Sequence, residues 1–245
     1  MAVWRKIWQD SIATGKEMLL KNDQKGKIFE KLKQEYPGDA MVIFEEAIAF
    51  DCMKCYKQAI ELYQKAFEEL PVEHWKENAR YLLNKAEKKV INIQIPKRTI
   101  ADAEDATTEE AAISFKLDAY YYLHSYYYLP HNVRYLAISS MSRIDTESNM
   151  AIAIFRTCIE VSLKKAFEKE YNFTKEDKLS YIIKKLDTDN KIEDMSSYFF
   201  KVNDMAIEAI HDAKIFTPKE IAKAIVYFDS SMVYLNKLFA KIYKA

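Results

Sequence analysis

The strongest constraint on this chain is a repeat with a period of 34 residues. Pro37 and Pro71 are separated by this interval, and the residues that precede the two prolines match in kind. The matched pairs are Phe29 with Tyr63, Leu32 with Ala66, Glu35 with Glu69, and Ala13 with Ala47. A period of this length is typical of helix–turn–helix units, which must stack because no unit can bury its apolar face alone. The N-terminal part is therefore predicted to be a stack of helical hairpins.

Residues 40–71 carry the repeat best. Small residues alternate with aromatic ones there, at Ala47, Tyr56, Ala59, Tyr63 and Ala66. Small side chains allow two helices to cross closely, the aromatic rings fill the space beside them, and the proline at position 71 ends the second helix. This pattern resembles the tetratricopeptide (TPR) repeat family.

The neighbouring units are less complete. The preceding unit has Lys25 and Gly26 where the better copy has Ala59 and Ile60, and the unit that begins at His74 keeps only a first helix. We therefore expect about two and a half repeats, close to the minimum for a stable stack. The TPR resemblance implies a surface that binds a protein partner, and not a reaction.

Composition sets the fold class. Among 245 residues there are only 3 Gly and 5 Pro, and the apolar residues recur at helical spacing without strand-like alternation. We predict an all-α protein.

The charge of the chain limits its partners. Its 37 basic and 37 acidic residues balance, which argues against a protein that mainly coats nucleic acid. No segment approaches the ~18 apolar residues of a membrane span, and the N-terminus has no signal-peptide core. We expect a cytoplasmic protein that has no membrane partner.

A Cys-x-x-Cys pair, Cys52 and Cys55, raises the question of a metal or redox site. A structural zinc site needs about four ligands, and the third cysteine, Cys158, is far away in the sequence. The pair also falls in a predicted turn between helices and not after a strand. We expect ordinary thiols, no metal and no cofactor.

The predicted helices divide the chain into two parts. Residues 1–91 form the TPR-like stack, with helices at 3–21, 24–36, 39–53, 56–69 and 73–91. Residues 92–107, which contain Pro96 and a run of small and acidic residues, are predicted to be a linker. Residues 108–245 form a helical bundle that begins with a tyrosine-rich helix near Thr108. Its further helices are predicted at 132–143, 147–171, 175–187, 191–212 and 217–243.

The tyrosine-rich helix has six tyrosines within nine residues and is expected to end at Pro130. Tyrosine has an apolar ring and a polar tip, which suits interfaces. We expect packing between the two parts or across a dimer, with Tyr121, Tyr122, Tyr126 and Tyr127 as partner-binding candidates. The alternative is a stacking platform for single-stranded nucleic acid, which would need interleaved cations, and only Lys116 and Arg134 are near.

The bundle contains a second family pattern. A helix that ends in His211-Asp212 precedes a loop and a long helix capped by Thr217, and an earlier helix carries Arg156 and Glu160 at i, i+4. Over residues 131–243 this arrangement resembles the HEPN superfamily, in particular bacterial HEPN-like domains found beside defence genes. Active HEPN members are metal-independent ribonucleases whose site forms between two protomers.

The resemblance implies a tentative catalytic set. His211 occupies the family's histidine position, Asp204 the polar position, and Asn203 the position where related sequences carry arginine. Arg156 could supply the missing cation only if its helix packs against that of Asn203. His211 has a simpler explanation, since a histidine at a helix C-terminus complements the helix dipole.

Three hypotheses follow. The first is an adaptor that binds a protein partner through the TPR-like stack and uses the HEPN-like bundle for dimerisation or RNA engagement, in a setting such as bacterial defence. The second is a metal-independent ribonuclease that acts as a homodimer. The third is a scaffold whose stack continues through the whole chain, which the predicted linker argues against. The missing arginine separates the first two.

Overall fold

The structure is a computed structural model that describes residues 3–90, 97–212 and 214–244. Within these ranges the chain contains twelve α-helices, one 3₁₀ turn and no strand, which confirms the prediction of an all-α protein. The chain divides into two compact units, Met1–Pro96 (unit 1) and Lys97–Ala245 (unit 2).

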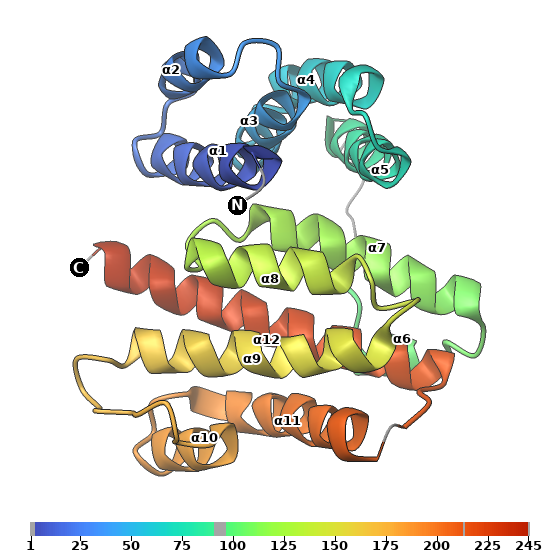
Figure 1. Cartoon of the computed structure of the whole chain (residues 1–245), viewed down its shortest axis with the longest axis vertical. Coiled ribbons are helices and arrows are strands. Elements are labelled where there is room, and N and C mark those ends of the chain that lie inside the picture. The colour runs from blue at the N-terminus through green and yellow to red at the C-terminus, as the bar shows by residue number, and fades with distance from the viewer. Residues whose placement is uncertain (1–2, 91–96, 213, 245) are drawn as a thin grey trace. The chain divides into compact units, whose positions relative to one another are not determined.

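Unit 1 consists of five helices (Figure 1). They are α1 (Val3–Leu20), α2 (Lys27–Glu35), α3 (Ala40–Cys52), α4 (Tyr56–Glu69) and α5 (Glu73–Val90). Helix α3 begins after Asp39, whose carboxylate accepts hydrogen bonds from the backbone amides of Met41 and Val42. Because α3 packs against both α1 and α4, its residues from Val42 to Asp51 are all buried. Helix α3 is thus the centre of unit 1.

The predicted hairpin between α3 and α4 is present. Ala47, Ala59 and Ala66 are completely buried, as expected where helices cross closely, and α4 ends at Glu69, two residues before Pro71. The preceding unit packs differently. Ala13, which the 34-residue period matches with Ala47, lies on the exposed face of α1, and α2 packs mainly against α1. The 34-residue repeat is therefore clearer in the sequence than in the packing of the helices.

Unit 2 is a bundle built around its last helix. Its elements are α6 (Ile100–Glu104), α7 (Glu109–Ser125), α8 (His131–Met141), α9 (Ser148–Ala166), α10 (Leu179–Thr188), α11 (Ser196–His211) and α12 (Pro218–Lys244). Helix α12 packs against α6, α7, α9 and α11, and the ring of Phe228 stacks on Phe155 of α9 with centroids 3.8 Å apart. Helices α9 and α11 lie side by side and run in opposite directions (Figure 1).

Several boundaries differ from the sequence prediction. The range 92–107, predicted to be a linker, contains α6. This helix begins with a capping box between Thr99 and Asp102. Residues 92–96 of that range lie outside the described part. Helix α9 ends at Ala166 instead of 171, and α10 begins at Leu179 instead of 175. Thr174, just before the predicted start at 175, lies in a local turn, in which its amide and hydroxyl donate to Asp177. Helix α11 begins at Ser196 instead of 191. The residues directly before it, Glu193–Met195, form the 3₁₀ turn, which begins at Glu193 with a positive φ of 50°.

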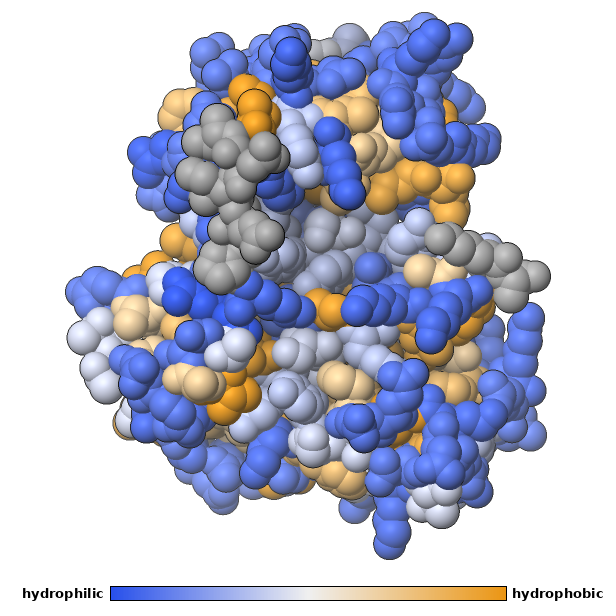
Figure 2. Space-filling view, turned by 180° about the vertical axis from the view of Figure 1, so that it is seen from behind, coloured by the Kyte–Doolittle hydropathy of each residue, from blue (hydrophilic) through white to orange (hydrophobic). Residues whose placement is uncertain are grey.

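Hydrophilic residues cover most of the face drawn in Figure 2, and apolar residues appear there in small separate groups. None of the helices in the described ranges combines the length and the hydropathy that a bilayer span requires.

Candidate functional site

The antiparallel pair of α9 and α11 brings Arg156 and Asn203 together. The Nε of Arg156 donates a hydrogen bond of 3.1 Å to Oδ1 of Asn203, which is almost fully buried. The packing that the HEPN-like hypothesis requires for Arg156 is therefore present. The guanidinium thus meets the Asn203 side chain, at the position where the resemblance led us to expect an arginine.

Arg156 is also held from the other side. Its Nη2 lies 3.7 Å from Oε2 of Glu160, and Glu160 in turn accepts from Nζ of Lys164 at 2.8 Å. Asp204 is exposed and its Oδ1 lies 3.4 Å from Nδ2 of Asn203. The positive charges of Arg156 and Lys164 are thus balanced by the negative charges of Glu160 and Asp204. A phosphate that approached Arg156 would have to compete with Glu160 for the guanidinium.

His211 is not part of this cluster within one chain. It is the exposed last residue of α11, eight residues beyond Asn203, which is about 12 Å along a helix. Asp204 and His211 are seven residues apart, so they share one face of α11 two turns apart. The structure therefore brings together Arg156, Asn203 and Asp204, and leaves His211 at a distance from the guanidinium.

The partner-binding candidates do not all lie in the same environment. Helix α7 ends at Ser125, so Tyr126 and Tyr127 lie in the turn beyond it and not on the predicted helix. Tyr121 is buried and its ring meets that of Tyr122 edge-on with centroids 5.3 Å apart, whereas Tyr122 is half-buried. Of these four tyrosines, three are buried and Tyr122 is the one that remains partly exposed.

Tyr126 and Tyr127 are engaged inside unit 2. The Tyr126 hydroxyl donates to Oδ1 of Asp229 at 2.9 Å, and burial raises the pKa of this tyrosine well above its usual range. Burial also raises the pKa of the Asp229 carboxyl, although Lys97, at 3.4 Å, acts in the opposite direction. The Tyr127 ring lies under the guanidinium of Arg134, 4.1 Å from its centroid.

Arg134 has a larger role than the sequence analysis gave it. Its side chain is completely buried and its Nη2 donates to the backbone carbonyl of His124 near the end of α7. The sequence holds one indication of this burial. Arg134 precedes Ala137 by three residues and Ile138 by four, so it lies on the same apolar face of α8 as these two.

Three buried carboxylates on α3 were also missed. Glu45 accepts from the Trp8 indole at 2.8 Å, Glu46 pairs with Lys33 at 3.1 Å, and Asp51 pairs with Lys89 at 2.7 Å. Burial raises the pKa of the Glu46 and Asp51 carboxyls, and their lysines oppose this rise. Each carboxylate has its own partner, so the row joins α3 to its neighbouring helices.

The cysteines form no chemical site in the described residues. All three are thiols outside any disulfide, and burial raises the pKa of Cys158 far above its usual range. In the part of the chain that the structure describes, no group of three or more His, Cys, Asp or Glu side chains is placed to hold a metal ion.

Comparisons with known proteins give no relative from which a role could be transferred. No protein-family model matches the chain, and neither curated proteins nor solved structures yield a match.

Proposed function

We propose that this protein is a non-catalytic adaptor. Its TPR-like stack in unit 1 binds a protein partner, and its HEPN-like bundle in unit 2 associates with a second copy of the chain. A bacterial defence system is the setting that the resemblance implies.

The environment of Arg156 carries this proposal. Asn203 occupies the position where an active HEPN enzyme would have arginine, and the nearby guanidinium is hydrogen-bonded to Asn203 and paired with Glu160. A ribonuclease of this type needs a cation directed at the phosphate. A guanidinium that already has partners on two sides favours a structural role that holds α9 against α11.

The surface of α11 supports self-association. Ile207 and Ile210 are 44% and 55% exposed, one turn apart, beside the exposed His211. Single exposed isoleucines are common on protein surfaces, but neighbouring ones on one helix are typical of interfaces. A second α11 could cover them.

One observation favours the ribonuclease as a second candidate. Asp204 and His211 are both exposed on the same face of α11. If two copies met through this face, the histidine of one protomer could approach the polar cluster of the other. An acid or base and a polar residue would then lie in one cleft.

Affinity capture with the full chain in an extract of its native host tests the adaptor proposal. The captured partner is then purified and its affinity is measured by calorimetry. We expect Trp4→Ser to weaken binding, because Trp4 is an exposed aromatic residue on α1, and aromatic residues are enriched among binding hot spots. The matched control is Ile242→Ser, which changes an exposed apolar residue of unit 2. If Ile242→Ser weakens binding and Trp4→Ser does not, unit 1 is not the partner-binding part.

A further inference from the structure

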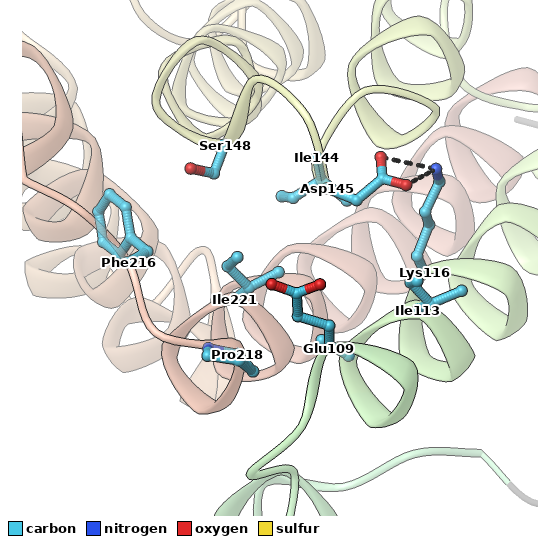
Figure 3. A pocket seen from close by; sticks show the side chains of 10 residues that line it. Glu109, Ile113, Lys116, Ile144, Asp145, Ser148, Phe216, Pro218 and Ile221 are labelled. Atoms are coloured by element: carbon cyan, nitrogen blue, oxygen red, sulfur yellow. Dashed lines mark hydrogen bonds and ion pairs between the residues drawn. The ribbon is translucent and has the colours of Figure 1, made fainter.

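Unit 2 contains a cavity of about 220 Å³ that has no part in the proposed function described above. It lies between the start of α7, the turn from α8 to α9, and the start of α12 (Figure 3). Its lining residues are Glu109, Ala112, Ile113, Lys116, Ile144, Asp145, Ser148, Phe216, Pro218 and Ile221. This volume equals that of about seven water molecules, which is enough for one long side chain.

The cavity combines apolar walls with one available carboxylate. Ile113, Ile144, Ile221 and the Phe216 ring form its walls, and the Glu109 carboxylate is directed into it (Figure 3). Across the described residues Glu109 has no hydrogen bond or ion pair.

The second carboxylate of the cavity is already neutralised. Both oxygens of Asp145 accept from Nζ of Lys116 at 2.8 Å. The lining therefore has a net charge of −1, which Glu109 supplies. An occupant that carries one positive charge would complement it.

We propose that this cavity binds an arginine side chain of a protein partner. The methylene stem of arginine would lie along the isoleucines and Phe216, and its guanidinium would bind the two oxygens of Glu109 in a fork. A purely apolar side chain fits less well, because it would remove water from the Glu109 carboxylate without replacing its hydrogen bonds. The inference rests on the proposed adaptor function and places one of its contacts in unit 2.

The mouth of the cavity favours a protein segment over a small free cation. Ile113, which lines the cavity, is 39% exposed. A small amine would leave this side chain in water. A peptide with an aliphatic residue beside its arginine would cover it and gain from its burial.

Methyl NMR of the full chain tests this inference with a capped Leu-Arg-Leu tripeptide as the probe. We expect the peptide to shift the methyl signals of Ile113, Ile144 and Ile221. An otherwise identical peptide with uncharged citrulline in place of arginine should bind at least about tenfold more weakly. Glu109→Gln should weaken the arginine peptide by a similar factor. Glu110→Gln, which changes the adjacent exposed carboxylate that does not line the cavity, should leave binding unchanged.

The outcomes separate this inference from the adaptor proposal. Equal binding of the two peptides, equal effects of the two glutamine variants, or no methyl shift at about 10 mM peptide would overturn the arginine site. If a captured partner binds Glu109→Gln as tightly as it binds the unaltered chain, the adaptor proposal stands and the arginine site does not. If the tripeptide binds through Glu109 but no partner is captured, the site stands and the adaptor proposal fails.

Discussion

Glu46 shows how one buried carboxylate makes stability depend on pH. Its carboxylate pairs with Lys33, its second oxygen is buried without a hydrogen bond in the described structure, and burial raises the pKa of its carboxyl above the ordinary 4.5. A carboxyl whose pKa is higher in the folded state favours folding when it is protonated. This contribution is complete below pH 4.5 and is lost as the pH rises through the folded-state pKa.

We therefore expect Glu46→Gln to stabilise unit 1 near neutral pH, by on the order of 1 kcal/mol, because the neutral amide does not have to hold a charge in the core. The gain should shrink as the pH falls toward 4.5. Thermal unfolding of both proteins across this range measures it. Glu30→Gln is the control, because Glu30 pairs with the same lysine but is largely exposed. A gain that is constant with pH would contradict the assignment.

Removal of Arg134 should strongly destabilise unit 2, because its large side chain is completely buried. Arg134→Ala would leave a cavity and remove both the hydrogen bond to the His124 carbonyl and the contact with the Tyr127 ring. We expect a loss of about 3 kcal/mol in the free energy of unfolding, measured with urea. Arg143→Ala, which removes an exposed arginine that lies 3.7 Å from Glu147, should change this free energy by less than about 0.5 kcal/mol. Similar losses for the two variants would mean that burial of Arg134 does not matter.

At the scale of the helix, apolar periodicity predicted most elements within a few residues, because each helix must bury one face. The end of α7 could not be predicted in this way. The Tyr128 amide donates to Oδ1 of Asn236 at 2.9 Å, and Tyr126 bonds to Asp229, both more than 100 residues away. These tertiary contacts hold the turn after Ser125, so the helix ends before the predicted end at Pro130. The contact between Arg156 and Asn203 likewise depends on the register of two packed helices.

The crossing of α3 and α4 gives a test of element packing. Ala59 and Ala66 are completely buried there, so Ala59→Leu or Ala66→Leu should overpack the crossing and cost about 1–3 kcal/mol. Ala13→Leu should have little effect, because Ala13 lies on the exposed face of α1 although the repeat matches it with Ala47. Melting temperatures of the three variants provide the comparison. If all three equal the unaltered protein, the alanines are not required for close packing.

At the scale of the whole molecule, self-association through α11 would be a property of the bundle. We expect Ile210→Lys to weaken the dimer, because it places a charge within the apolar surface that a second copy would cover. Sedimentation velocity over a range of concentrations measures the effect. Ile242→Lys places the same charge at an exposed isoleucine near the end of α12 and should leave the dimer intact. A monomer at every concentration in the unaltered protein would exclude this role for α11.

Whether the molecule is an adaptor or an enzyme can be decided by an RNA cleavage assay without metal. The guanidinium of Arg156 is engaged by Asn203 and Glu160, and His211 lies about 12 Å along α11 from Asn203. We therefore expect no cleavage by the unaltered chain. If the site were active, His211→Ala would lower the rate by a factor of ~10² to 10⁴. Cleavage that disappears in His211→Ala would overturn the adaptor proposal in favour of the ribonuclease. Cleavage of equal rate in both proteins would not depend on His211 and would point to a contaminating nuclease.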